Sequence, residues 1–228
     1  MTRALILLAF AVLGCNAGLG VAQTAKTVDP TGARMSVGFS GASNEYDAQR
    51  GGPGLANFSF EPAWRVGLGR QTDLGFGPWL GYGMQLDVKH ELTPRAKPYG
   101  VALRGGFGVS AGSPTSYSGL VGAIGSYELA SGLAPYASVA FRNFWFYEGH
   151  RRSAPTDGSR WAERNGWGDG LLQMTAGLRF GRGRSAFYLE YARWQPMQND
   201  PGDFFKLAAS HVFSFTVGFC LDRWCRQG

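Results

Sequence analysis

A serine and a histidine near the end of the chain are the residues whose types most suggest catalysis. Ser210 and His211 are adjacent, and Glu190 lies on the segment before them. A serine, a histidine base and an acid together can cleave an acyl ester by nucleophilic attack. However, neighbouring residues of a β-strand point to opposite faces, so Ser210 and His211 should not meet if this segment is a regular strand. We therefore expect no catalytic residue and keep an acyl hydrolase as the alternative.

A basic stretch between residues 148 and 168 is the second candidate, because it combines positive charge with aromatic rings. Guanidinium groups bind phosphates and carboxylates through paired hydrogen bonds. An anionic ligand could therefore bind here, although a solvated surface loop is the simpler interpretation. The surface-loop residues concerned are His150, Arg151, Arg152, Arg160, Trp161 and Arg164.

Two cysteines, Cys220 and Cys225, lie close together near the end of the chain. In an exported protein, an oxidising compartment would favour a disulfide between them. Two cysteines without a neighbouring histidine cannot close a tetrahedral zinc site. Glycine pairs such as Gly105-Gly106 precede no predicted helix, so they do not make a phosphate-binding loop. We expect no metal and no cofactor.

Residues 1–22 have the pattern of a secretion signal. Arg3 precedes an apolar run that is too short to span a bilayer as a helix, and small residues then lead to a cleavage site after Ala22. A lipoprotein box ending at Cys15 is the alternative, and it would leave that cysteine lipidated. Either route predicts export.

Period-two alternation of apolar with small or polar residues recurs along the rest of the chain, which predicts an all-β protein. The longest run, Leu74 to Lys89, exceeds a usual soluble strand of about 5 or 6 residues. A tilted strand that spans a membrane needs about 9 to 11 residues. The nine alternating segments are 34–40, 58–69, 74–89, 99–108, 120–129, 135–142, 172–180, 187–192 and 213–219.

The two faces of these segments favour a membrane. A sheet that spans hydrocarbon must close on itself and turn its apolar face outward. The other face is small and carries acidic and basic groups in near balance, which could pair in a narrow lumen. A soluble ligand-binding barrel with its apolar face inward stays open as an alternative. The predicted lumen polar network is Glu61, Arg65, Gln85, Asp87, Lys89, Arg104, Arg142, Arg179 and Glu190.

Connection lengths limit the strand number without settling it. Single-chain bacterial barrels have an even number of strands, but nine segments are counted, and short and long connections fall out of phase near residues 91–117. We expect a closed antiparallel up-and-down barrel of eight strands, with ten as the alternative. Residues 23–32 are predicted to be a short N-terminal linker, 33–221 the barrel and 222–228 a C-terminal tail.

The last segment, which runs from His211 to an aromatic residue at Phe219, resembles the final strand of small outer-membrane β-barrel proteins of Gram-negative bacteria. The resemblance implies a location in the cell outer membrane, insertion by the barrel-assembly machinery, and contact with outer-membrane lipids and lipopolysaccharide. The resemblance indicates no particular activity. Our leading interpretation of the whole pattern is a porin-like, non-enzymatic protein with a narrow, largely filled lumen that serves envelope structure, surface interaction or minor passage of small solutes. A lipid A-modifying acyl hydrolase is the enzymatic alternative within this class.

Composition agrees with these expectations. The chain has 35 glycines and 14% aromatic residues, and only 17% of its residues are charged, against roughly 25% in soluble domains. The net charge of +6 is scattered rather than gathered in a lysine-rich run, so we expect no nucleic-acid partner. Interface belts are expected from Tyr99, Tyr127, Trp145, Tyr191 and Trp194.

Overall fold

A computed structural model describes residues 23–44, 57–79, 83–110, 115–147, 170–181, 185–197 and 210–220. These residues form ten strands, so the expectation of eight was wrong and the alternative of ten holds. The strands are β1 (Ala33–Asn44), β2 (Asn57–Gly67), β3 (Thr72–Trp79), β4 (Gly83–Glu91), β5 (Tyr99–Ser110), β6 (Thr115–Tyr127), β7 (Leu133–Tyr147), β8 (Gly170–Phe180), β9 (Ser185–Pro196) and β10 (Ser210–Cys220).

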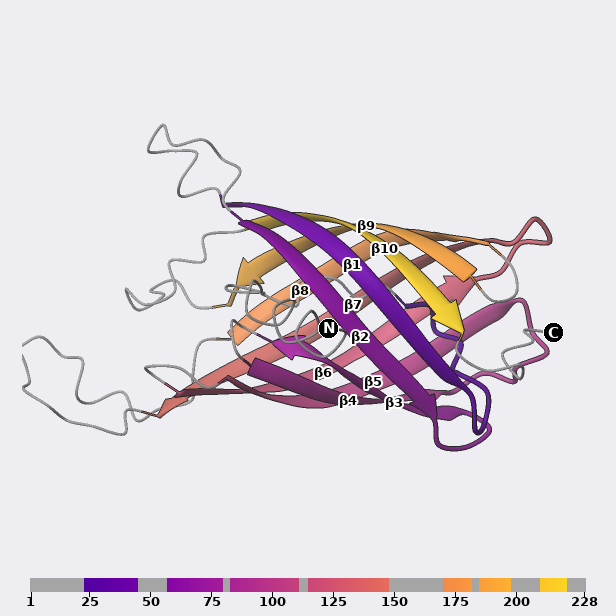
Figure 1. Cartoon of the computed structure of the whole chain (residues 1–228), viewed down its shortest axis with the longest axis horizontal. Helices are drawn as coiled ribbons and strands as arrows, with labels where there is room; N and C mark the ends of the chain where they lie inside the picture. The colour runs from indigo at the N-terminus through magenta and orange to yellow at the C-terminus, as the bar shows by residue number, and fades with distance from the viewer. Residues whose placement is uncertain are drawn as a thin grey trace, which may run out of the picture.

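Each strand pairs antiparallel with the next along the chain, and β1 pairs with β10, which closes the barrel (Figure 1). The closing register runs from Arg34 opposite Cys220 to Asn44 opposite Ser210. Closure gives every strand two neighbours, and the shortest ladder, between β2 and β3, covers four residue pairs.

The missing strand lies inside the longest alternating run. The run from Leu74 to Lys89 is two strands, β3 and β4, joined through residues 80–82. In this hairpin Pro78 faces Met84 and Phe76 faces Leu86, so even-numbered residues share one side of the wall on both strands. The alternation therefore passes through the turn without a break, and periodicity alone could not reveal it.

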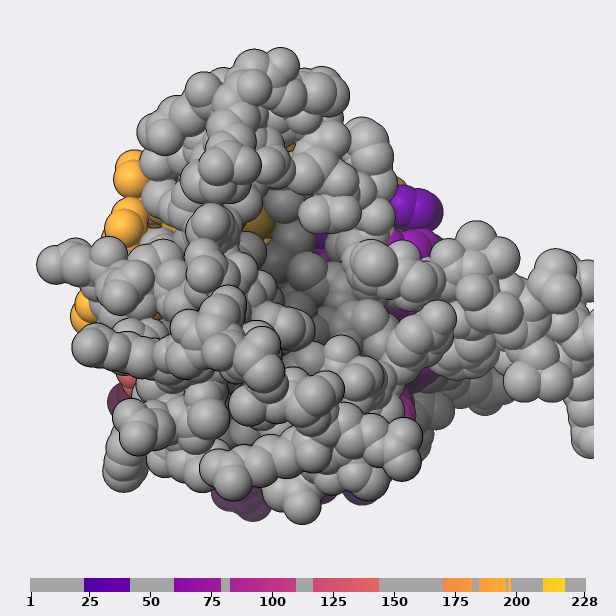
Figure 2. Space-filling view, turned by 90° about the vertical axis from the view of Figure 1, so that its left-hand side faces the viewer, coloured from indigo at the N-terminus to yellow at the C-terminus, as the bar shows by residue number. Residues whose placement is uncertain are grey.

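With ten strands, the three longest connections all fall at one end of the barrel. The connections at one end, here named the short-turn end, are residues 68–71, 92–98, 128–132 and 181–184. The opposite, long-loop end receives residues 45–56, 80–82, 111–114, 148–169 and 197–209. Figure 2 views the barrel from the long-loop end, with β8 and β9 in orange on one side of the view and β1 and β2 in indigo and purple on the other.

The wall turns its apolar side chains outward. Met84, Leu86 and Val88 of β4 are about half exposed on the outside of the wall. Gln85 and Lys89, which alternate with them along the strand, are buried inside. The same pattern holds at Leu103 and Phe107 of β5. The interior is therefore the polar face, and not the apolar face that the soluble ligand-binding alternative required. Among the described residues, no helix has the length and apolar character needed to cross a bilayer.

Candidate functional site

A chain of buried ion pairs occupies the short-turn half of the lumen. Arg65 of β2 donates to Asp73 of β3 at 2.6 Å and to Asp87 of β4 at 2.8 Å. Arg104 of β5 donates to the other oxygen of Asp87 at 3.0 Å, and the Lys89 ammonium lies 3.5 Å from Asp73. Every charge in this chain has an opposite neighbour, which offsets the cost of removing it from water.

Arg142 of β7 anchors a second group across the lumen. Its guanidinium donates to Gln85 at 2.7 Å and to Gln173 at 3.2 Å, and it lies over the Trp194 ring at 5.5 Å. Arg142 is only 1% exposed. Contacts with two amides and an aromatic face therefore hold a cation deep inside the barrel.

The remaining predicted lumen residues also lie on the inner face. Glu61 accepts a hydrogen bond from Ser40 at 2.6 Å, and Glu190 accepts one from Ser214 at 2.9 Å. Arg179 pairs with Glu128 at 3.3 Å near the short-turn end. The structure thus places all nine predicted lumen residues on the inner face of the wall.

Sequence reasoning missed several inner residues that carry the contacts. Asp73 and Glu91 are fully buried, and both lie on the odd-numbered face that already contained Asp87 and Lys89. Extending the alternation by one position before Leu74 and by two beyond Lys89 would have found them.

The N-terminal segment, residues 23–31, is more than a linker, because its residues 23–28 lie inside the barrel. The Lys89 ammonium donates to the carbonyl oxygens of Thr24 at 3.0 Å and Lys26 at 2.8 Å. The backbone amide of Val28 donates to Asp73 at 3.0 Å, and that of Ala25 to the Ser126 hydroxyl at 3.2 Å. Buried backbone groups need such partners, and here lumen side chains supply them.

Further contacts fix this segment at the short-turn end. Glu91 accepts from the Lys26 ammonium at 3.0 Å. Arg95, in the connection between β4 and β5, pairs with Asp29 and donates to the carbonyl oxygen of Val28 at 2.9 Å. The chain then reverses into β1 through Thr31, whose φ of 66° is in the left-handed region. The segment therefore enters from the short-turn end and runs back into the lumen.

Gly67 packs directly against the backbone of the N-terminal segment. A Cβ at this position would lie 2.0 Å from the carbonyl oxygen of Asp29, whereas a Cβ at Gly69 would meet nothing within 4 Å. We expect Gly67→Ala to lower the free energy of unfolding by about 1–3 kcal/mol, because backbone must move to admit the methyl group. The matched variant Gly69→Ala should change it by less than about 0.5 kcal/mol. Urea unfolding followed by tryptophan fluorescence in lipid vesicles measures both, and equal effects would contradict the tight contact.

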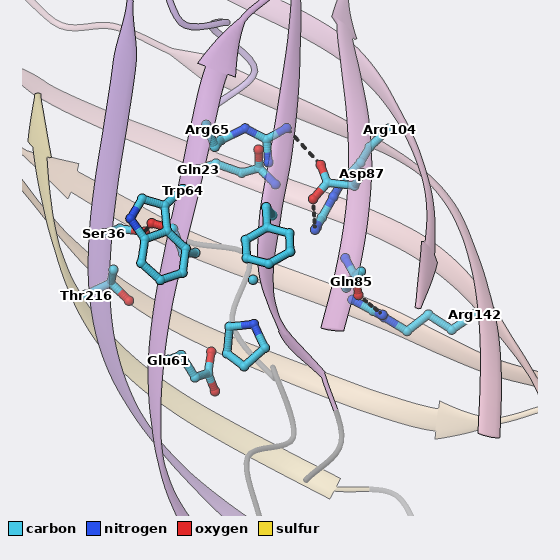
Figure 3. Close-up of a pocket in the computed structure, with 14 residues that line it drawn as sticks. Gln23, Ser36, Glu61, Trp64, Arg65, Gln85, Asp87, Arg104, Arg142 and Thr216 are labelled. Carbon is cyan, nitrogen blue, oxygen red and sulfur yellow. Dashed lines mark hydrogen bonds and ion pairs between the residues drawn. The ribbon is translucent and has the colours of Figure 1, made fainter. Parts of the chain in front are cut away.

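A cavity of about 80 Å³ lies beside the ion pairs, next to Gln23. Figure 3 shows Arg65 and Arg104 on either side of Asp87, and Gln85 bonded to Arg142. Three arginines and two carboxylates line the space, so its walls carry one excess positive charge. The lining residues are Gln23, Ser36, Glu61, Ala63, Trp64, Arg65, Phe76, Gly77, Pro78, Gln85, Asp87, Arg104, Arg142 and Thr216.

The residues considered for acyl hydrolysis are not brought together. His211 bonds to the Tyr191 hydroxyl at 2.6 Å on the outer side of the wall, in the ring cluster that includes Phe213. Glu190 lies inside, bonded to Ser214. The wall therefore separates the histidine from the acid. Within the described residues, no group of three or more metal-ligating side chains occurs.

The aromatic residues expected at the interfaces divide between the two faces. Tyr99 and Tyr127 face each other across β5 and β6 at the short-turn end, and both are about half exposed. Tyr191 lies outside with His211. The expectation that Trp194 lies at a membrane interface was wrong. Its side chain points inward against Arg142 and is 4% exposed. The Trp145 side chain lies outside the described part of the structure.

Several sequence predictions fall outside the described residues. These are the secretion signal with Cys15, the surface-loop residues between 148 and 169, Cys225 and the C-terminal tail. Cys220 ends β10, and its side chain is likewise not described, so the disulfide stays a prediction.

The fold and lumen together define a class: a closed antiparallel barrel with an apolar exterior and a charged interior. No protein-family model and no curated protein matches the sequence. In its overall barrel pattern the chain is similar to solved outer-membrane β-barrel structures.

Three of these structures illustrate the level of similarity. The outer membrane protease OmpT from Escherichia coli is 11% identical, with 86% of this chain and 98% of that chain covered and a TM-score of 0.42. The outer membrane protein Ail from Yersinia pestis is 10% identical, with 84% and 99% covered and a TM-score of 0.39. The N-terminal β-barrel domain of OprF from Pseudomonas aeruginosa is 10% identical, with 82% and 97% covered and a TM-score of 0.36.

Proposed function

We propose that the chain is a non-enzymatic integral protein of the bacterial outer membrane, with a lumen closed by its own charged side chains and its N-terminal segment. Its role would be in envelope structure or surface interaction, with little passage of solutes. The observation that carries this proposal is the combination of a closed wall, an apolar exterior and a polar interior.

The exterior supports the membrane location. Phe39, Leu103, Val121 and Phe213 come from different parts of the wall, and each is more than half exposed. In water, so much exposed apolar surface would drive association. In a bilayer the same side chains would meet lipid tails, and the closed wall gives every strand two neighbours with which its backbone can pair.

The filled lumen supports a closed state. Arg142 and Gln173 occupy the interior almost without solvent contact, and the backbone of residues 23–28 takes up space nearer the short-turn end. Lumen side chains hold both groups by hydrogen bonds and ion pairs. Passage of ions or small solutes would require these contacts to break.

A charge placed on the outer face tests the location directly. We expect Val121→Arg, near the middle of β6, to destabilise the barrel in lipid by about 2–4 kcal/mol, because the guanidinium would face hydrocarbon. The control, Leu129→Arg, lies just beyond β6 at the short-turn end and should cost about 0–1 kcal/mol. Urea titration of the protein folded into vesicles gives both values. A similar, small effect at both positions would contradict a bilayer around the wall.

Cell fractionation tests the compartment. The full chain should fractionate with the outer membrane, and its mobility in detergent gels should change on heating because a folded barrel unfolds only when boiled. A mature protein that remains a dissolved monomer without detergent would overturn the proposal.

An enzyme of the same membrane is the weaker alternative. Separation of His211 from Glu190 by the wall removes the acid that the hydrolase hypothesis requires. Mass spectrometry of lipid A from cells with and without the protein decides this point, and an acyl chain lost only when the protein is present would revive the hydrolase.

A further inference from the structure

The lumen cavity is lined by buried polar atoms that lack a hydrogen-bond partner among the described residues. Arg104 donates to Asp87 through one Nη at 3.0 Å, but its Nε is buried and has no partner in the described part of the chain. The Oε1 atom of Gln23, on the N-terminal segment, is likewise buried and without a partner there. Both side chains line the cavity (Figure 3). Because an unmet buried donor is costly, the cavity suits an occupant that presents oxygen atoms to Arg104.

The charge of the lining favours an occupant with a single negative charge. Three positive and two negative side chains surround the space: Arg65, Arg104, Arg142, Glu61 and Asp87. Asp87 is shared by Arg65 and Arg104, at 2.8 and 3.0 Å. Just beyond the lining, Asp73 and Lys89 carry opposite charges 3.5 Å apart and add no net charge. A monovalent anion would therefore balance the excess positive charge, whereas a divalent anion would reverse it.

Small residues on the inner face keep the space open and limit its size. Ala63 of β2 and Gly77 of β3 both line it, and the Ala63 Cβ lies 3.4 Å from the position that a Cβ at Gly77 would take. The cavity volume is about 80 Å³, against roughly 30 Å³ for one water molecule in the liquid. The space therefore admits a group of a few non-hydrogen atoms but no long chain or ring.

We propose that this cavity binds a small monocarboxylate anion of the size of formate or acetate. The Nε of Arg104 would donate to one carboxylate oxygen, in the charge-assisted hydrogen bond that guanidinium groups favour. Gln23 borders the same space, so the bound anion would lie between the barrel wall and the N-terminal segment. The inference adds a ligand to the filled lumen and does not depend on the membrane location.

Equilibrium dialysis with radiolabelled acetate tests the site. The full chain is refolded into non-ionic detergent micelles with acetate present, at neutral pH and constant ionic strength, so that the anion need not enter a barrel that has already closed. We expect saturable binding at one site, and Arg104→Gln should weaken it by about tenfold, because one charge-assisted contact is lost. The matched control is Arg179→Gln, which removes a buried lumen arginine that does not line the cavity and should leave binding unchanged.

Competitors and a cavity-filling variant separate charge from size. Formate should displace acetate, whereas acetamide, which has the same shape but no charge, should not. The anion 2,2-dimethylpropanoate carries the same charge but is too large for the cavity, so it should not displace acetate either. Ala63→Leu fills the space without changing any charge in the lining, and it should abolish acetate binding.

The outcomes separate this inference from the proposed function. Heat-modifiable gel mobility first shows that each variant is folded. A folded wild-type barrel that binds no acetate holds only water in this cavity, and the inference is then wrong. Unchanged binding after Arg104→Gln or Ala63→Leu, or displacement by 2,2-dimethylpropanoate as readily as by formate, also overturns it. A chain that binds acetate but does not enter membranes overturns the proposed function and leaves the carboxylate site standing.

Discussion

A barrel that begins at Gly32, without residues 23–31, is expected to conduct ions severalfold better in planar bilayers than a chain prepared to begin at Gln23. The N-terminal segment holds its place through Lys89, Asp73 and Glu91, and its backbone excludes water from the lumen. Without it, this polar surface becomes the wall of an aqueous path. The deletion frees Glu91 from Lys26 and Arg95 from Asp29, so it leaves the net charge of the wall unchanged. Single-channel current in planar bilayers measures the conductance of both chains.

A second variant guards against failure of the shortened chain to fold. In the full chain, Gly67→Ala should loosen the packing of the N-terminal segment against the wall at Asp29. The variant should therefore show brief channel openings with the same conductance as the shortened barrel. Gly69→Ala should remain closed. If the folded, shortened barrel and the full chain carried the same current, the segment would not close the lumen.

Replacement of Asp73 by asparagine is expected to cause the largest loss of stability among single substitutions in the lumen, about 3 kcal/mol or more. Asp73 is fully buried, pairs with Arg65 and Lys89, and accepts from the amide of Val28. Asparagine keeps the shape but leaves the Lys89 ammonium without its carboxylate. Urea unfolding in vesicles, followed by tryptophan fluorescence, gives the free-energy change.

The control for this substitution is Asp29→Asn. Asp29 and its partner Arg95 are each about one-third exposed, so loss of this ion pair should cost less than about 1 kcal/mol. A result in which Asp73→Asn is as mild as Asp29→Asn would show that the buried pairs do not hold the lumen together.

The direction of each wall side chain was readable from the sequence. Met84 to Val88 of β4 alternate outward and inward as predicted, and Glu61, Arg142 and Glu190 lie on the inner face. Trp194 shows which part of the sequence signal to follow. Its even-numbered position in β9, hereafter its parity, places it inside, but its residue type suggested a membrane interface. Parity was the better guide, because side-chain direction in a strand follows from the backbone and not from the nature of the side chain.

The particular contacts of the lumen were not readable in this way. Arg65 could have paired with any acid on the inner face, and the choice of Asp73 and Asp87 depends on the registers between β2, β3 and β4. The N-terminal segment gave no periodic signal, because an extended chain that bonds to side chains has no regular partner strand.

By itself, the sequence determined that this protein is built of long strands with one apolar and one polar face, because alternation is a local property of the backbone. Tertiary structure alone decided that the strands number ten, that residues 23–28 fill part of the lumen, and that only four residue pairs join β2 to β3. Each of these depends on which segments pair and in what register. Pairing joins residues far apart in the chain, and local periodicity carries no information about it.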